Sequence, residues 1–264
     1  MKRAIGILCF FVFVSGAFSQ DKIVEVGEEL NYSVYYGFIK LGEVKFKVTG
    51  KNKEGKNELI TATASIKSFD AIPMININYI FESIMLTEKN EVRSAKFTAT
   101  EFKEKSITNI YYTFDYDNDE IKTLKEVDGK SGAEQVINIE NKKKYQDGLS
   151  LLYNARLQSK SDKTNQRFNV PVYINEKESS VRYSFSSKPE EVEIDLEDYG
   201  IRCVRVAGVA DFVGVFGLTG EFGGWFSDDD YRVPIKAKFN VTIGSITLEL
   251  ASYKKKNWKA PVYK

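Results

Sequence analysis

The sequence predicts an all-β fold: a mainly antiparallel sheet of about thirteen strands, curved into a half-barrel or barrel around one or two short helices. Three observations support this prediction. Apolar and polar residues alternate along most of the chain, which is typical of strands with one buried face. Clusters rich in Gly, Asn, Asp and Lys separate the alternating runs. Two segments break the alternation, so a curved sheet around a small helical part fits better than a helix-free sandwich.

The alternation begins in residues 29–37, where one face is apolar: Leu30, Tyr32, Val34 and Tyr36. Comparable runs follow at residues 43–50, 57–68, 92–102, 106–117, 120–128, 134–140, 166–176, 179–187, 191–196 and 231–253. Turn clusters such as KNKEGKN, DNDE and EDYG connect them. Successive strands joined in this way are expected to pair as a meander.

Two segments have the pattern of short helices. Residues 145–160 follow the helical period, with Asp147 or Gly148 placed to start the helix. The apolar and basic positions at this spacing are Leu149, Leu152, Tyr153 and Arg156. The second segment begins at Asp70 and has Pro73 in its first turn, a position that proline favours.

Residues 1–19 are typical of a signal peptide, with a basic start, an apolar core at 4–14 and small residues before Gln20. A retained membrane anchor is the alternative, but the core is short for a spanning helix of about 20 residues. We therefore expect export to the periplasm, or secretion. Residues 20–253 show no repeat or linker and are expected to form a single β-rich domain.

Residues 254–264 contain five lysines, Trp258 and Tyr263. A basic segment with aromatic residues can contact an anionic membrane surface peripherally. The alternative is a solvated tail that protects the edge of the last strand. We expect the solvated tail.

Composition excludes several classes of function. The chain has no histidine, which excludes Ser–His–Asp and Cys–His catalysis and all His-ligated metal sites. Loss of residues 1–19 would remove Lys2 and Arg3, leaving 36 of the 38 basic residues against 37 acidic ones. That balance argues against binding to nucleic acid. Cys203 would be the only remaining cysteine, and we expect it to pack as a small hydrophobe.

Two acidic clusters could either hold a cation or form turns. Residues 228–230 are consecutive aspartates before Pro234; neighbours on an extended chain point to opposite sides, so we favour the tip of a hairpin. The other cluster matches four positions of an EF-hand calcium loop: Asp115, Asp117, Asp119 and Glu126. Glu120 stands where that loop requires glycine. We favour a solvated turn there, and a calcium site of another type remains the alternative.

Ser150 is the most suggestive nucleophile, but Tyr153 stands where a Ser-x-x-Lys pair needs its lysine. We therefore expect the helix to dock on the sheet, while Arg156 pairs with a carboxylate. No catalytic residue, metal site or cofactor is expected.

Aromatic residues are abundant on both faces of the predicted strands. Consecutive pairs such as Tyr111 and Tyr112 must point to opposite faces, and residues 211–226 add five aromatic residues among five glycines. Two interpretations stay open: a large core with glycines at bends, or a cavity for a ligand. The residues expected to line such a cavity are Tyr32, Tyr36, Tyr112, Phe114, Leu152, Tyr153, Phe222 and Trp225.

Three segments are similar to a known family. VEVGEELNYSVYYGFIKLGEVKFKV has the Gly–Glu, the Leu-x-Tyr strand and the later Gly42. YQDGLSLLYNARLQ matches an Asp-x-Leu-Ser-x-Leu-Tyr-x-x-Arg helix, and residues 224–253 match a closing hairpin with an Asp turn and Arg-x-Pro. From about residue 24 to 253 the chain thus resembles an exported bacterial family, domain of unknown function 3108. The resemblance implies fold and location, and the family has no established activity.

The closing hairpin also resembles, more faintly, that of periplasmic lipoprotein and lipid carriers, which hold acyl chains in a half-barrel. We expect a non-enzymatic envelope protein that binds a lipid or a lipoprotein acyl chain in a cavity of the curved sheet. The alternative is a structural or interaction module that binds an envelope protein or glycan through its sheet surface. A carboxylate-based glycan hydrolase would need two acids about 5–10 Å apart in a cleft.

Overall fold

The computed structural model describes residues 22–55, 57–72, 75–88, 91–159, 166–217, 219–241 and 244–264. The signal peptide expected at residues 1–19 lies outside this part of the chain. Within it, no helix has both the length and the apolar character needed to cross a bilayer.

Fifteen strands of the described chain form one antiparallel sheet, which confirms the predicted fold class. They are β1 (Glu29–Tyr36), β2 (Ile39–Glu54), β3 (Asn57–Ser68), β4 (Asn78–Glu88), β5 (Glu91–Lys103), β6 (Ser106–Asp115), β7 (Glu120–Val127), β8 (Lys130–Ser131), β9 (Gln135–Asn138), β10 (Arg167–Ile174), β11 (Lys177–Val192), β12 (Ile201–Ala210), β13 (Gly220–Ser227), β14 (Pro234–Asn240) and β15 (Ser245–Lys254). Their order is β10-β11-β12-β13-β14-β15-β1-β2-β3-β4-β5-β6-β7-β8, and β9 pairs with β7. The sheet is a meander in which the first strand lies beside the last.

Bulges, and a close approach between two neighbouring strands, contribute to the curvature of this sheet. The pairing of β2 with β3 shifts between Val48 and Gly50, and that of β11 with β12 shifts likewise. Such irregularities increase local twist and curvature. At Gly42 a Cβ would lie 2.2 Å from the carbonyl oxygen of Lys67, so only glycine allows β2 to approach β3 this closely.

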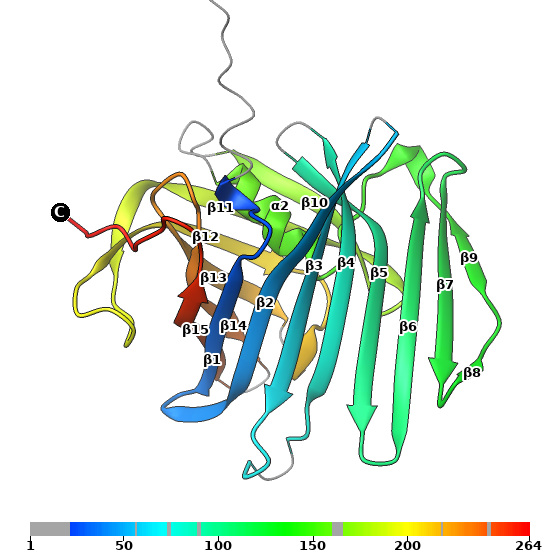
Figure 1. Ribbon diagram of the computed structural model, residues 1–264, viewed down its shortest axis with the longest axis horizontal. Helices are drawn as coiled ribbons and strands as arrows, with labels where there is room; N and C mark the ends of the chain where they lie inside the picture. Colours follow the sequence, from blue (N-terminus) through cyan, green and yellow to red (C-terminus); the bar gives the residue numbers. More distant parts are fainter. Residues whose placement is uncertain are drawn as a thin grey trace, which may run out of the picture.

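The curved sheet forms two walls with helix α2 (Ser150–Gln158) between them (Figure 1). In the view of Figure 1, β1 to β9 make the front wall, and β10 to β13 lie behind. Tyr153 and Leu157 of α2 pack in a core cluster with residues of β2 to β7. Leu151 and Ala155 pack against a second cluster from β10 to β13. The helix therefore fills one end of the space between the walls.

The segment before α2 connects the edge strand β10 with β5 on the opposite wall. Gln146 forms a parallel bridge with Val172 of β10. On its other side, the backbone N–H of Ser94 in β5 donates to the carbonyl of Tyr145 at 3.0 Å, and the Gln146 side chain donates to the carbonyl of Val92 at 2.5 Å. One short segment thus closes the gap between β5 and β10 near the helix, although the sheet itself is not closed into a barrel.

Two local expectations are wrong. The helix expected from Asp70 is a single turn in the described residues, where the N–H of Ile72 donates to the carbonyl of Phe69 at 3.1 Å; Pro73 lies outside them. Residues 75–77, just before β4, are neither helix nor strand. Residues 193–196 are not a strand, because they leave the sheet and bury Ile194 in the core beside β12 to β15.

The C-terminal segment is packed on the fold and is not a solvated tail. Trp258 is only 6% exposed, and its indole N–H donates to Asp229 at 2.8 Å. Val262 forms an antiparallel bridge with Ile201 at the start of β12. Lys255 is buried as well. The expected boundary at residue 254 therefore does not mark a free tail, and the side chains of Trp258 and Lys255 are buried and engaged within the fold.

Candidate functional site

A cavity of about 540 Å³ lies between the two walls. It is bordered by β1 to β6, β10 to β15 and α2, and most of its lining is apolar. Among the described residues that line it, Glu101 and Lys236 are the only charged ones. A concave apolar site of this size with few polar groups is typical of small-molecule binding.

A ladder of aromatic rings forms one side of the cavity. Tyr79 and Phe81 of β4, Phe97 of β5 and Tyr112 of β6 stack in sequence, with ring centroids 5.6, 5.7 and 5.6 Å apart. Phe97 and Tyr112 are directly paired across the strands, where aromatic side chains pack best. Ala99 stands opposite Phe81 and leaves space in front of the ladder.

The two ends of the cavity differ. Helix α2 and the residues just before it cover one end, through Gly148, Leu149, Leu151, Leu152 and Ala155. At the other end the lining reaches exposed residues in turns, Asn175 between β10 and β11 and Thr219 before β13. We call this the mouth end. Strand pairing places the turns at residues 36–39, 68–78, 103–106, 127–130, 174–177, 210–220 and 240–245 there.

Asp147 fixes the start of α2 from inside the protein. One carboxylate oxygen accepts from the hydroxyls of Ser83 and Ser94 at 2.6 and 2.7 Å. The other accepts from the N–H groups of Leu149 and Ser150 at 2.7 and 2.8 Å. The residue is fully buried, and no described Lys or Arg forms an ion pair with it. Burial raises the pKa of Asp147 above its usual value, although the hydrogen bonds oppose this.

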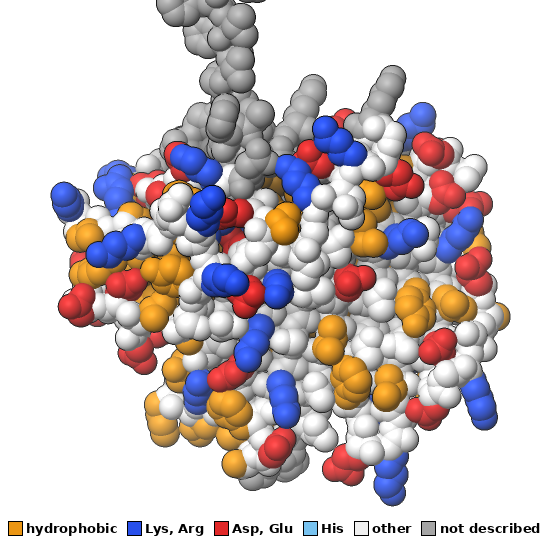
Figure 2. Space-filling view, in the orientation of Figure 1, with side chains coloured by type: hydrophobic (Ala, Val, Ile, Leu, Met, Phe, Trp, Pro, Cys, Tyr) orange, Lys and Arg blue, Asp and Glu red, His pale blue; other side chains and the backbone are white. Residues whose placement is uncertain are grey.

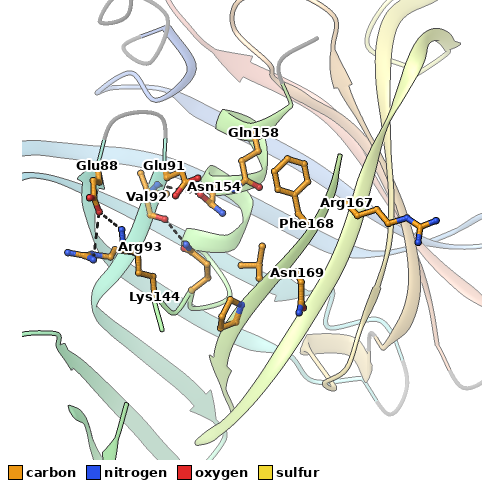
Figure 3. Close-up of a pocket in the computed structure, with 13 residues that line it drawn as sticks. Glu88, Glu91, Val92, Arg93, Lys144, Asn154, Gln158, Arg167, Phe168 and Asn169 are labelled. Carbon is orange, nitrogen blue, oxygen red and sulfur yellow. Dashed lines mark hydrogen bonds and ion pairs between the residues drawn. The ribbon is translucent and has the colours of Figure 1, made fainter. Parts of the chain in front are cut away.

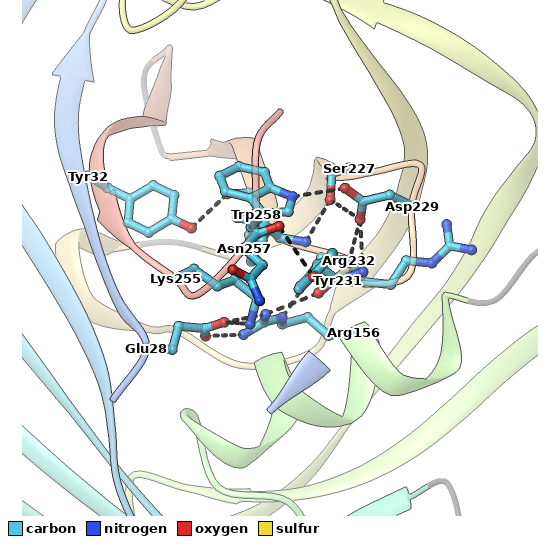
Figure 4. A network of polar contacts seen from close by, with 12 residues as sticks. Glu28, Tyr32, Arg156, Ser227, Asp229, Tyr231, Arg232, Lys255, Asn257 and Trp258 are labelled. Atoms are coloured by element: carbon cyan, nitrogen blue, oxygen red, sulfur yellow. Dashed lines mark hydrogen bonds and ion pairs between the residues drawn. The ribbon is translucent and has the colours of Figure 1, made fainter. Parts of the chain in front are cut away.

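Glu28, Arg156 and Lys255 form a buried ionic cluster beside α2 (Figure 4). Arg156 donates two hydrogen bonds to Glu28, at 2.6 and 2.9 Å, and Lys255 donates to the same carboxylate. Arg156 also donates to the backbone carbonyls of Tyr231 and Arg232 at 3.4 and 3.1 Å. Glu28 is thus the carboxylate expected for Arg156. Burial pushes the pKa of Glu28 up, but the two cations outweigh it and hold that pKa below its usual value.

Five of the eight residues expected at a cavity line this one: Tyr32, Tyr112, Leu152, Phe222 and Trp225. The other three do not. Phe114 and Tyr153 are 5% and 1% exposed and pack in the core, because Phe114 lies two residues beyond Tyr112 along β6, toward the helix. Tyr36 is 37% exposed, because it is the last residue of β1 and precedes the turn at Gly37.

Asp228 and Asp229, which follow β13, form hydrogen bonds and an ion pair with nearby protein groups. Asp229 accepts from the N–H of Tyr231 at 2.9 Å and from Trp258. Asp228 pairs with Arg202 at 2.8 Å. These side chains hold the loop and the C-terminal segment, as expected for a hairpin tip.

Asp115, in the other acidic cluster, accepts from the backbone and side-chain N–H groups of Asn118 at 3.1 and 2.9 Å. This is a side-chain-stabilised turn between β6 and β7. In the part of the chain that the structure describes, no three His, Cys, Asp or Glu side chains group to hold a metal ion. Ser150 belongs to the Asp147 network, and Cys203 is buried, which raises its thiol pKa.

A second, smaller pocket of about 330 Å³ lies among the β4–β5 turn, α2 and β10 (Figure 3). Its charged side chains are largely engaged with one another. Glu88 accepts from Lys144 at 2.6 Å and lies 3.8 Å from Arg93. This polar pocket does not suit an apolar chain.

Three rings of the ladder, Tyr79, Phe81 and Phe97, were not among the residues expected at a cavity. A signal was present for β4, because NYIFESIMLTE is rich in apolar and aromatic residues, which favour strands. Ala99 and Ala237, which leave room in the cavity, carry no comparable signal because alanine is common everywhere.

A family model covers most of the chain. The model of a family described as "Protein of unknown function (DUF3108)" matches residues 31–251. The chain belongs to the DUF3108 family. This confirms the resemblance found in its sequence segments. Among curated proteins, none matches this DUF3108 chain.

Solved structures were found that are similar to this DUF3108 protein to different degrees. A β-barrel-like protein of the domain of unknown function DUF1849 from Brucella abortus is similar, with a TM-score of 0.54 and 8% identity over 88% of this chain and 99% of that one. This likeness shows the fold alone. A protein with a YmcC-like fold from Bacteroides fragilis has a TM-score of 0.34 and 9% identity over 88% and 97% of the chains. LprF from Mycobacterium bovis has a TM-score of 0.21 and 10% identity over 92% of each chain. The last two likenesses are too loose to carry an argument.

Proposed function

We propose that this DUF3108 protein is an exported, non-enzymatic binding protein that holds the apolar chain of a lipid, or of a lipoprotein, in the cavity between its walls. The observation that carries the proposal is the cavity of about 540 Å³ lined by aromatic and aliphatic side chains. Each buried methylene of an acyl chain contributes about 0.8 kcal/mol to binding. The stacked rings of Tyr79, Phe81, Phe97 and Tyr112 offer a continuous apolar surface to such a chain.

The polar groups of the lining favour an amphiphile over a hydrocarbon. The hydroxyl of Tyr79 donates to Glu101 at 2.5 Å, and both residues line the cavity on strands β4 and β5. Glu101 lies two residues before the end of β5 at the mouth. An acyl chain would therefore extend toward α2, and its polar head would stay near the mouth end.

Mass spectrometry of organic extracts tests the proposal directly. The protein is purified without detergent from its native envelope, and we expect a lipid at close to one per chain. Recovery of a cooperatively folding protein that contains no lipid and binds no fluorescent fatty acid would contradict it. The interaction module would then be pursued through capture of envelope proteins or glycans.

Replacing two different alanines with phenylalanine, one in the cavity and one outside it, tests where the ligand lies. Ala237→Phe places a ring in the cavity, and we expect the affinity for a fluorescent fatty acid to fall about tenfold or more, because losing contact with two methylenes costs about 1.6 kcal/mol. Ala251→Phe changes an exposed position of β15 and should leave affinity unchanged. Equal affinities of the two variants would place the ligand elsewhere.

A further inference from the structure

Exposed apolar side chains gather at one end of the molecule. The structure has eleven large apolar side chains that are exposed within its described residues, and seven of them lie at or near the mouth end. These seven are Tyr36, Phe38, Ile39, Ile80, Ile107, Val127 and Val213. Figure 2 shows hydrophobic side chains over the β1–β2 turn at the lower left and over the lower parts of β4 to β6. Most of the exposed large apolar side chains in the described residues therefore lie at the end where the cavity opens, although Figure 2 also shows hydrophobic side chains elsewhere on this face.

Phe38 is the most protruding of these side chains. It is 95% exposed, and Ile39 beside it is 45% exposed. The turn between β1 and β2 contains Gly37, with a φ of 59°, and Phe38, so the ring stands at the tip of a tight hairpin. On the opposite wall Val213 is 55% exposed, next to Phe212, which lines the cavity.

Charges at the mouth end are balanced. Among the described residues, the exposed charged side chains in the mouth-end turns are four basic ones, Lys103, Lys105, Lys130 and Lys177, and five acidic ones, Asp70, Glu104, Asp128, Glu176 and Asp211. This end therefore has no strong field of either sign to attract a polyanion or an anionic surface. Attachment here must depend on the apolar side chains.

A bilayer surface is the partner that this arrangement fits. The apolar residues are divided among the β1–β2 turn, the segment after β12 and the mouth-end residues of β4, β6 and β7, on both walls of the cavity. They therefore do not form one flat patch that a protein would cover. Single side chains on different segments can enter a lipid interface at the same time, because the lipids adapt to the positions of the side chains. The affinity of the protein for the bilayer then follows the apolar area that is inserted. A cavity that opens in the middle of this ring would face the source of acyl chains without intervening water.

We propose that the mouth end docks on the surface of a lipid bilayer, with Phe38 inserted among the lipids, and that ligands enter and leave the cavity there. This inference rests on the proposed function for the ligand, but the docking surface can be tested by itself. It assigns a role to Phe38 and Ile39, which do not line the cavity.

Flotation with neutral phosphatidylcholine vesicles tests the docking surface. The protein purified from its envelope is compared with Phe38→Asp and with Val26→Asp; Val26 is 50% exposed at the opposite end. We expect the protein and Val26→Asp to float with the vesicles, and Phe38→Asp to bind about tenfold less or weaker, since burying a Phe side chain contributes about 1.5–3 kcal/mol. Raising the salt concentration should change the bound fraction little, because the charges at the mouth end are balanced.

Three results would overturn the proposal: no flotation of the unchanged protein, equal flotation of Phe38→Asp and Val26→Asp, or flotation that requires anionic lipid and is lost in high salt. Binding of a fluorescent fatty acid in solution, without vesicles, is measured on the same three proteins. We expect equal affinity in all three. Absence of that binding would count against the proposed cavity function, whatever the flotation result.

Discussion

Replacing Glu28 with Gln will lower the free energy of unfolding by about 3–5 kcal/mol. The change removes the one anion between Arg156 and Lys255, whose side chains are fully buried. Two cations would then remain out of water without a counter-charge, which costs more than the loss of the ion pair itself. Urea unfolding followed by circular dichroism measures the change.

Glu29→Gln provides the matched control for this prediction. Glu29 is the next residue and pairs with Lys47 at 3.0 Å, but both side chains are solvent-accessible. We expect a loss below about 1 kcal/mol. Comparable losses in the two variants would show that the buried cluster is not the source of stability.

The same cluster makes a pH-dependent contribution. The folded-state pKa of Glu28 lies below the ordinary value of 4.5. Its stabilisation is therefore present above pH 4.5 and is lost as the pH falls through the folded-state pKa. The difference in stability between the unchanged protein and Glu28→Gln should shrink in that acidic range.

Replacing Asp147 with Ala will cost about 2–4 kcal/mol in the free energy of unfolding. The change leaves the N–H groups of Leu149 and Ser150 without their acceptor, as well as the hydroxyls of Ser83 and Ser94. All of these donors are buried. We expect the start of α2 to loosen, with faster amide exchange in α2 and weaker fatty-acid binding.

Asp147→Asn separates charge from hydrogen bonding. Because the folded-state pKa of Asp147 is raised above 3.8, the folded protein binds more protons than the unfolded chain between these two values. Stability from this group is therefore greatest below pH 3.8 and falls as the pH rises through the folded-state pKa. The stability of the protein relative to Asp147→Asn should decline over this window and then stay constant. A relative stability that rises with pH would contradict the raised pKa.

Fold class could be predicted because local pattern and global fold agree. Alternation in residues 29–37 or 57–68 predicts strands, and the Asp147 to Arg156 pattern predicts the helix that the structure contains. The pattern of single residues does not show where segments meet. Residues 193–196 alternate like a strand, yet bury Ile194 outside the sheet.

The sequence does not show how far along a strand, from the mouth end toward α2, a side chain lies. This was the main limit on predicting which residues line the cavity. Tyr112 and Phe114 share one face of β6, and alternation cannot distinguish them. Only the pairing of β5 with β6 places Tyr112 beside Phe97 at the cavity and Phe114 further toward α2. Lys255 poses the same difficulty, because its burial depends on Glu28, 227 positions away in the sequence.

The place of β1 between β15 and β2 has a consequence for the order of folding. Among the described strands, β1 comes first along the chain, and β15, one of its two neighbours, comes last. The backbone edge of β1 that faces β15 therefore stays unpaired until β15 has been synthesised, and contacts of such long sequence separation slow the search for the native state. A nascent or truncated chain that ends before residue 245 would present this edge to other chains, so we expect aggregation to be the greatest risk in that interval.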